Sequence, residues 1–275
     1  MKTVITSSDK SILNLGELKS YSGLFKYLSL RDVSVRYKQT KVGFAWSILR
    51  PIINIAIFGC LSILVDKSQS PSDKFLMVSA GIIFWQLIST AITETSNSLT
   101  ANANILTKVY LPKLILPLSS LLVCIIDFFI AFTIFLIVFI IFKGLPAWQI
   151  VFTPFLLIYG LIFCFGLGLI FATASVKFRD VKFILPFIIQ ILFYASPVFL
   201  NTEFILKLNI PEFVKVIYQI NPLVFMLDAF KYCIYGSFEN FNVLYFCISF
   251  AITFLILVVS LKYFLNFEKS FADYI

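Results

Sequence analysis

The sequence predicts an all-α membrane protein with six transmembrane helices, an N-terminal amphipathic interfacial helix, and short re-entrant helices between spans five and six. Two observations support this fold class. Hydrophobic residues make up 60% of the 275-residue chain and charged residues only 13%, whereas soluble domains average about 25% charged residues. Six apolar stretches also approach or exceed the roughly 20 residues that a helix needs to cross a bilayer.

Residues 21–41 mix apolar with basic side chains ahead of the first apolar stretch. Leu24, Leu28 and Val35 share one helical face and are interspersed with Lys and Arg. This pattern predicts a helix along the membrane interface, held by apolar contact and by anionic lipid. A flexible basic tail is the alternative interpretation. Residues 1–20 are polar and lack an apolar core, so we expect no cleaved leader peptide.

The six apolar stretches give the predicted spans. Arg50 lies near the start of the first, and Asp127 is the single charge in the third. The fifth is 18 residues long and close to the lower limit for a crossing helix. The spans cover residues 44–65, 75–93, 114–142, 148–176, 183–200 and 241–261. We expect residues 1–275 to form a single transmembrane domain.

The segment between the fifth and sixth spans, residues 201–240, is too apolar for a hydrated loop. Asn221 and Pro222 interrupt its most apolar part. Proline cannot continue a helix interior and restricts the residue before it, so two short helices are expected to meet there. They either dip into the outer leaflet and return, or form a small external cap on the bundle.

Basic residues are distributed unevenly between the connections. Sixteen of the 22 Lys and Arg residues lie in the N-terminal region up to Arg50, in the C-terminal region and in the connections at 94–113 and 177–182. Cytoplasmic loops carry the excess of Lys and Arg in membrane proteins. We therefore expect both termini on the cytoplasmic side.

The composition argues against catalysis in this chain. It contains no His, which removes the usual metal ligand and the usual acid–base group near neutral pH. No GxxxxGK[ST] loop and no Ser/His/Asp set is present either. We expect no catalytic residue and no metal site. Asp127, about midway along a span, either lines a pore or makes a structural hydrogen bond to a neighbouring helix.

Two short cytoplasmic connections, residues 101–117 and 176–182, combine basic with apolar side chains. The first ends in Pro112 and Pro117, which would stop a helix and fix the angle of the next span. Such a connection suits contact with a soluble motor domain. Simple anchoring by positive charge is the alternative.

Several motifs, in this order along the chain, resemble those of the transmembrane subunits of ATP-binding-cassette type 2 polysaccharide exporters. That family moves lipid-linked O-antigen, capsule or teichoic-acid chains across the bacterial plasma membrane. One departure is that Lys113 and Leu114 follow Pro112, where the family often carries an Arg-Glu pair. The motifs are Val35, Arg36, Tyr37, Lys38, Gln39 and Thr40 with Gly43, Trp46, Leu49 and Pro51; Tyr110 to Lys113 with Ile115 to Ser119; Lys177 to Val181; Ser196 to Val198; and Asn221 to Leu223.

The resemblance implies a non-enzymatic permease subunit in the bacterial inner membrane that carries O-antigen-type polysaccharide. Its partners would be a second copy of itself, two ATP-binding-cassette ATPase subunits, membrane lipid and the lipid-linked polysaccharide, with no nucleic acid. ATP and magnesium would bind in the ATPase, and this chain would hold no cofactor. A drug or lipid exporter of the same architecture is an alternative. A membrane enzyme acting on lipid-linked sugars ranks lower, because clustered acidic residues are missing.

The resemblance also implies roles for individual residues. The coupling contact to the ATPase would involve Lys108, Val109, Tyr110, Leu111, Pro112 and Lys113, and the second cytoplasmic loop would contribute Lys177, Arg179 and Asp180. A cytoplasmic gate would include Arg36, Tyr37 and Lys38, and an external gate Asn221 and Pro222. Aromatic rings let a glycan slide without a deep energy well. The channel candidates are Asp127, Trp46, Trp85, Tyr159, Phe163 and Tyr194.

Overall fold

The computed structural model describes residues 20–38, 44–65, 70–109, 111–199, 202–236, 242–268 and 271. All regular structure among them is helical. The helices in chain order are α2 (Ser22–Lys38), α3 (Phe44–Val65), α4 (Pro71–Ala101), α5 (Ala103–Lys108), α6 (Ile115–Lys143), the 3-10 helix η1 (Trp148–Phe152), α7 (Thr153–Lys177), α8 (Val181–Tyr194), α9 (Thr202–Lys207), α10 (Glu212–Ile220), α11 (Pro222–Tyr235) and α12 (Val243–Glu268).

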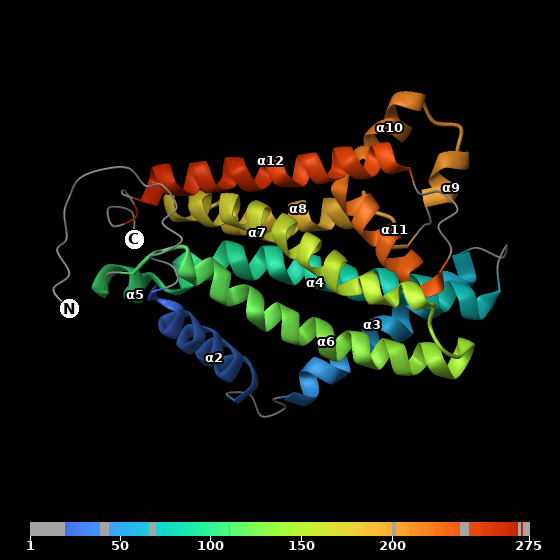
Figure 1. The fold of residues 1–275 in the computed structure, drawn as a ribbon, viewed down its shortest axis with the longest axis horizontal. Coiled ribbons are helices and arrows are strands. Elements are labelled where there is room, and N and C mark those ends of the chain that lie inside the picture. Colours follow the sequence, from blue (N-terminus) through green and yellow to red (C-terminus); the bar gives the residue numbers. More distant parts are fainter. Residues whose placement is uncertain are drawn as a thin grey trace.

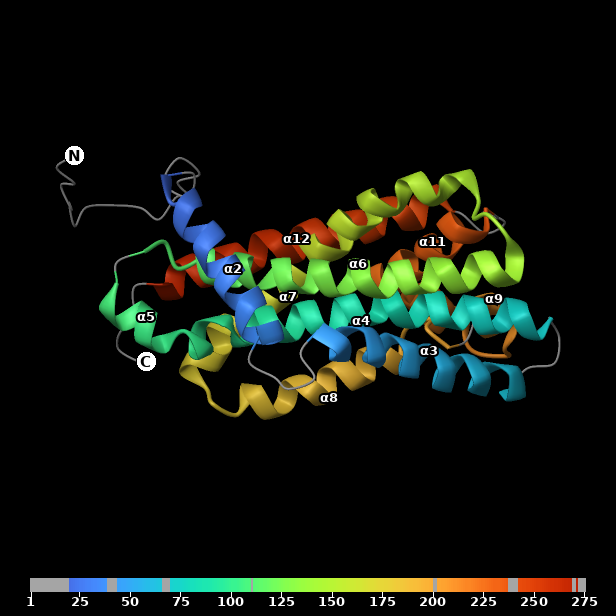
Figure 2. The same ribbon diagram turned by 90° about the horizontal axis from the view of Figure 1, so that it is seen from below.

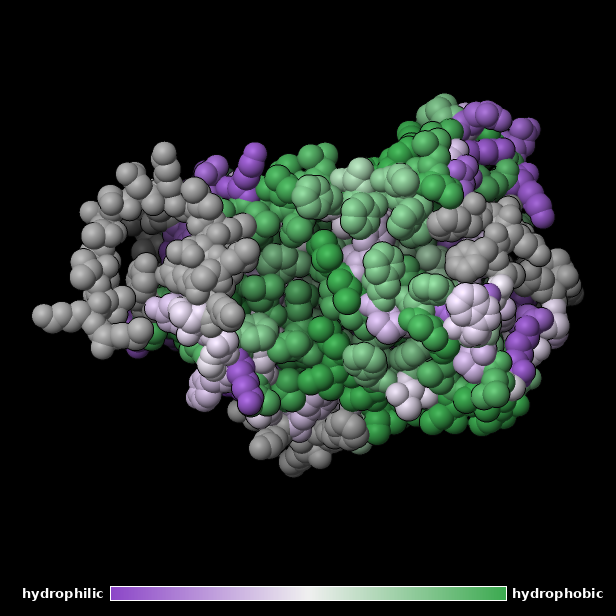
Figure 3. Space-filling view, in the orientation of Figure 1, coloured by the Kyte–Doolittle hydropathy of each residue, from purple (hydrophilic) through white to green (hydrophobic). Residues whose placement is uncertain are grey.

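The long helices lie side by side in one elongated bundle (Figure 1). At one end lie α2, α5 and the last turns of α7 and α12, and at the other lie α9 and α10. We call these the α5 end and the α10 end. Hydrophobic residues cover most of the middle of the bundle surface, and hydrophilic residues gather toward the two ends (Figure 3). This distribution fits a bundle whose middle lies in hydrocarbon.

The predicted spans agree with five long helices. Among the described residues, five helices are long and apolar enough to cross a membrane, and a sixth is reached only if the bent pair α10 and α11 counts as one. The five contain or nearly match the stretches predicted at 44–65, 75–93, 114–142, 148–176 and 241–261. The second is longer than predicted, because α4 runs through the hydroxyl-rich residues 95–101.

The fifth predicted span, residues 183–200, is wrong as a full-length helix. α8 has 14 residues, about 21 Å at 1.5 Å per residue, against a hydrocarbon core of about 30 Å. Residues 195–199 continue as turns and a bend. Pro197 explains the break, since it lacks an N–H donor and disfavours helical geometry at the residue before it. The helix therefore ends at Tyr194, just before the Ser196-Pro197 pair, and is too short by itself to cross the hydrocarbon core.

Helix α4 is the centre of the bundle and packs against α3, α6 and α7. Its contact with α7 depends on Gly168, where a Cβ atom would lie 2.7 Å from Cγ2 of Thr95. Small residues allow this close approach of helices in membranes, where apolar burial alone does not favour association. Farther toward the α10 end, Phe84 stacks on Phe230 of α11 with ring centroids 4.7 Å apart.

The predicted break at Asn221 and Pro222 is confirmed. Asn221 is the N-cap of α11, and its Oδ1 accepts a hydrogen bond from the Leu223 N–H at 3.0 Å. Pro222 takes the first helical position, where a missing N–H costs nothing. Helices α10 and α11 meet there at 69°. Because α11 packs against α4 and α7 while α10 has no buried residue, only the second arm enters the bundle.

The expected interfacial segment forms the helix α2, and residues 39–41 fall outside the described residues. Helix α2 lies outside the bundle at an angle to α6, near the α5 end (Figure 2). Leu28 is buried and Leu24 partly buried, but Tyr27, Leu30 and Val35 are exposed. Its apolar residues therefore do not form one continuous face, and its amphipathic character stays a prediction.

Candidate functional site

Helix α2 is bound to α4 and α6 by two polar clusters, and the first contains residues of the predicted cytoplasmic gate. The Tyr37 hydroxyl donates a hydrogen bond of 2.5 Å to Oδ1 of Asp127 on α6. Nη1 of Arg36 lies 3.3 Å from Oδ2 of Asp127 and 3.4 Å from Oε1 of Glu94 on α4. One guanidinium thus bridges carboxylates on two helices. Lys38 ends α2 beside this cluster.

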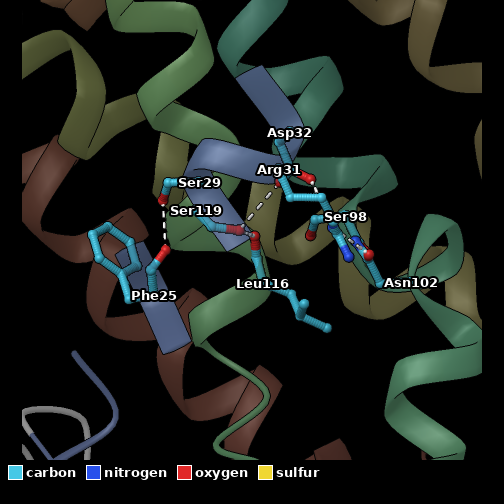
Figure 4. A network of polar contacts seen from close by, with 8 residues as sticks. All are labelled: Phe25, Ser29, Arg31, Asp32, Ser98, Asn102, Leu116 and Ser119. Atoms are coloured by element: carbon cyan, nitrogen blue, oxygen red, sulfur yellow. Dashed lines mark hydrogen bonds and ion pairs between the residues drawn. The ribbon is translucent and has the colours of Figure 1, made fainter. Parts of the chain in front are cut away.

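The second cluster lies earlier on α2 and is centred on Arg31 (Figure 4). Its Nη2 lies 2.6 Å from Oδ1 of Asp32 and donates to Oδ1 of Asn102 at 2.7 Å. The Asn102 side-chain N–H in turn donates to the Ser98 carbonyl at 2.8 Å. Ser119 Oγ on α6 lies 3.5 Å from Oδ2 of Asp32. Arg31 and Asp32 therefore join α2 to the C-terminal end of α4 and the start of α6.

Partial burial strengthens these contacts relative to ion pairs in open water. The Asp127 side chain is 20% exposed and that of Arg36 29% exposed. A charge removed from water is costly unless an opposite charge and hydrogen bonds satisfy it, and Asp127 has both. Burial and the neighbouring Asp127 raise the pKa of Tyr37 above its ordinary value. The phenol therefore keeps its proton and remains a hydrogen-bond donor.

These contacts bear on the two interpretations of Asp127. The structure places its carboxylate against α2, where it bonds to Arg36 and Tyr37. That arrangement agrees with a structural hydrogen bond to a neighbouring helix. It joins a predicted channel residue to two predicted gate residues, although 90 positions separate Tyr37 from Asp127 in the sequence.

A cavity of about 530 Å³ lies between α2, α4 and α6 next to both clusters. We call it the α2 cavity. Eight of its eleven lining residues are charged, amide or hydroxyl residues, and the other three are apolar. The lining residues are Arg31, Asp32, Val35, Arg36, Glu94, Asn97, Ser98, Ala101, Asn102, Ser120 and Val123.

Sequence reasoning missed most of this wall. Glu94 directly follows the span predicted at 75–93, but in the structure it lies inside α4, which continues to Ala101. The available signal is the spacing of Glu94, Asn97, Ser98 and Ala101, which places polar or small residues on one helical face. Arg31 and Asp32 carry no comparable signal, because adjacent opposite charges are common on any exposed helix.

At the α5 end, the predicted coupling residues divide into exposed and buried ones. Lys108 and Val109 are exposed, whereas Leu111 is buried and Pro112 is half-buried. Tyr110 lies outside the described residues. The predicted helix in this connection is present as α5.

Lys113 contacts the chain's own C-terminal region. Its Nζ donates to the Glu268 carbonyl at the end of α12 and lies 5.1 Å from the ring centroid of the buried Phe271. Burial lowers the pKa of Lys113 below its ordinary value. The amine is therefore part of an internal contact that fixes the start of α6 against the end of α12.

The second predicted loop lies at the same end of the bundle. Lys177, Phe178, Arg179 and Asp180 are exposed. Nζ of Lys177 lies 5.1 Å from the Phe178 ring centroid and 5.4 Å from that of Phe267 on α12. Both connections predicted to be cytoplasmic thus contact the C-terminal end of α12 or the residues that follow it.

The aromatic channel candidates do not share one surface. Trp85, Tyr159 and Phe163 are buried within the bundle, and the Tyr159 hydroxyl lies 2.8 Å from Ser249 Oγ. Trp46 on α3 and Tyr194 on α8 are 56% and 74% exposed. Helices α3 and α8 lie on the same side of α4 in Figure 2, and Phe58 and Phe193 bring them into contact, with ring centroids 6.2 Å apart.

Comparisons with known proteins agree with this architecture. Residues 23–235 match the family model described as ABC-2 type transporter. The O-antigen export system permease protein RfbA of Klebsiella pneumoniae is 27% identical over 264 residues, which cover 94% of this chain and 96% of that protein. A second RfbA from that organism is 27% identical over 273 residues, covering 97% and 99%. The protein of the same name from Myxococcus xanthus is 26% identical over 219 residues, covering 80% and 83%.

The family match covers most of the chain, and it includes α2, the two polar clusters, the α2 cavity and the break at Pro222. The helices long and apolar enough to span a membrane fit the transport role of the relatives. The chain is therefore a multi-pass membrane permease subunit that belongs to the ABC-2 type transporter family.

Proposed function

We propose that this chain is the permease subunit of an ATP-driven exporter that moves lipid-linked, O-antigen-type polysaccharide from the cytoplasm across the bacterial inner membrane. The observation that carries the proposal is similarity along nearly the whole chain to proteins named O-antigen export system permease. These two similarities cover 94% and 97% of the chain, so little of it is left for an unrelated activity.

In this proposal the α5 end faces the cytoplasm. The basic residues of the connections at 94–113 and 177–182 support that orientation. Two ATPase subunits, which hold ATP and magnesium, would bind the exposed surface of α5 and the turn at Phe178 and Arg179. An exposed aromatic side chain such as Phe178, 55% accessible here, is typical of residues that dominate a protein interface.

The exporter would contain two copies of this chain, with the glycan path between them. The outward surface of α3 and α8 supports this arrangement. Arg50 on α3 and Gln190 on α8 are exposed, although both helices are strongly apolar. Polar residues within membrane segments face a protein interior or a wet path, since contact with hydrocarbon is costly. The exposed rings of Trp46 on α3 and Tyr194 on α8 would line the path.

The two gates follow from the same arrangement. Helix α2, held by Arg36 and Tyr37, would close the cytoplasmic mouth, and opening would require the Arg36–Asp127 contact to separate. The elbow at Asn221 and Pro222 would close the external mouth. The fixed N-cap of α11 would let α10 pivot on that elbow while α11 stays in the bundle.

The test is to express the chain with candidate ATPases and to measure which substrate stimulates ATP hydrolysis in proteoliposomes. Lipid-linked glycan should stimulate hydrolysis and should be transported. Deletion of the gene for this chain in the host should leave that glycan inside the cell. Stimulation by drugs or simple lipids alone would assign the chain to a different exporter class. Glycan modification without transport would assign it to the membrane enzymes.

A further inference from the structure

The α2 cavity has the chemistry of a binding site. Its volume of about 530 Å³ lies within the range of roughly 300–1,000 Å³ that is usual for small-molecule pockets. Val35, Ala101 and Val123 supply an apolar patch, and the remaining wall is polar or charged. Val35 is itself 48% exposed, so α2 does not seal this side of the cavity.

The charges of the wall select against an anion. Arg31 and Arg36 are the two cations of the lining, and Asp32 and Glu94 are its two anions. Asp127 adds a third carboxylate 3.3 Å from Arg36. A phosphate or diphosphate would have to displace these carboxylates from both guanidinium groups, against like-charge repulsion. A cation would be repelled by the two guanidinium groups.

The remaining hydrogen-bonding capacity suits an uncharged ligand. A guanidinium has five N–H donors, and the contacts described above use Nε and Nη2 of Arg31 and Nη1 of Arg36. Glu94 contacts Arg36 through Oε1, and its second oxygen can accept. The Asn97 amide makes no hydrogen bond to another residue in the described part of the chain, and it supplies both donor and acceptor.

Donors and acceptors beside an apolar patch match a sugar ring, which has hydroxyl groups at its edges and apolar C–H faces. We propose that the α2 cavity binds an uncharged sugar residue of the exported substrate, before the glycan enters the path between the two copies. This inference rests on the proposed function and deepens it. It makes Asn97 a residue that contacts the sugar and makes α2 one wall of the sugar site.

The experiment measures thiol accessibility in the complete exporter, with its ATPase subunits, in nanodiscs. The exposed Cys60 and Cys247 are replaced by Ser, and the variant Ala101→Cys places a single accessible thiol at the rim of the cavity while Asn97 is kept. A neutral maleimide labels this thiol in the presence of methyl glycosides of glucose, galactose, mannose or N-acetylglucosamine, or of inorganic diphosphate. The matched control is Lys26→Cys, an exposed position on α2 that is not part of the cavity lining.

At least one methyl glycoside should slow labelling at position 101 several-fold and leave the control unchanged, while diphosphate should have no effect. Adding Asn97→Ala, which removes the proposed contact to the sugar, should abolish the protection. Protection by diphosphate alone, or by none of the compounds, would overturn the sugar site. If no glycoside protects the thiol but the protein transports the glycan, the sugar site alone is refuted. If the unmodified protein transports no glycan, the proposed function is refuted.

Discussion

The Tyr37 hydroxyl donates a 2.5 Å hydrogen bond to Oδ1 of Asp127. This bond joins α2 to an ionisable residue inside α6. It positions Arg36, the neighbour of Tyr37, so that the guanidinium contacts Asp127 and Glu94 together. The docking of α2 against the bundle is therefore electrostatic at this point, although the surrounding protein is strongly apolar.

Replacing Tyr37 by Phe should loosen α2, because it removes a donor to a partly buried carboxylate. The expected cost is about 1.5–3 kcal/mol, the range for hydrogen bonds to charged groups. Spin-label distances between α2 and α6 should broaden. The exposed Tyr27, 67% accessible, gives the matched control Tyr27→Phe, which should leave the distances unchanged. Equal broadening in both variants would refute the role of this bond.

Raising the pH into the alkaline range should also weaken the docking of α2. The pKa of Tyr37 is raised in the folded protein above its ordinary 10.0, so the folded state retains the phenol proton longer than the unfolded state. The contribution of Tyr37 is then complete below about pH 10 and is lost as the pH rises through the folded pKa. Spin-label distances should stay unchanged up to about pH 10 and should broaden only as the pH is raised further, and Tyr37→Phe should lack that pH dependence.

Arg36 and Asp127 should show strong coupling in a double-mutant cycle. Arg36→Gln alone leaves the Asp127 carboxylate partly buried without its cation, and should cost about 1–2 kcal/mol, less than the 3–5 kcal/mol of fully buried pairs because both side chains keep some exposure. Asp127→Asn in the same chain should recover much of that loss. Thermal unfolding in nanodiscs measures the four proteins. Additive effects of the two substitutions would show that the pair is not coupled.

Tyr110→Ala should weaken ATPase binding or uncouple hydrolysis from export. The residue lies between the exposed Val109 and the buried Leu111, at the coupling connection. Loss of a dominant aromatic contact costs about 2 kcal/mol or more at protein interfaces, roughly a 30-fold change in affinity. Lys182→Ala, in the second connection, is the comparison and should do less. Recovery of the ATPase complex and glycan-stimulated hydrolysis measure both; unchanged coupling in the Tyr110 variant would return the connection to an anchoring role.

Gly81→Ala should destabilise the α10 end of the bundle. A Cβ at Gly81 would lie 2.9 Å from the Val198 carbonyl oxygen and 3.1 Å from Cε of the buried Lys231. Such overpacking costs about 1–3 kcal/mol. Gly23→Ala is the control, since a Cβ there meets nothing within 4 Å. Thermal unfolding should separate the two variants, and equal melting temperatures would contradict the close approach.

The proposed orientation makes a prediction for reporter fusions. A reporter active only in the cytoplasm should give signal when fused after Ile275 and none when inserted at Asn209, beyond α9. The physical reason is the excess of Lys and Arg in the connections at the α5 end. The opposite pattern would reverse the orientation and, with it, the roles of the two gates.

The apolar stretches predicted the long helices because a bilayer requires both an apolar surface and a minimum length, and sequence records both. The Asn221-Pro222 break was predictable for a similarly local reason, since the missing N–H and the N-cap are properties of adjacent residues. The family resemblance came from short motifs of the same local kind.

The length of α8 and the partners of Asp127 were decided by tertiary structure. The run at 183–200 is apolar enough to span, yet the chain turns at Pro197 and packs Val198 against Gly81 of α4. Trp85, Tyr159 and Trp46 look alike as aromatic residues within spans, but only packing determines that the first two are buried and the third exposed. The α2 cavity combines residues of three helices, from Arg31 to Val123. Composition and periodicity report what one helix requires of its solvent, whereas the contacts between helices depend on how distant segments fit together.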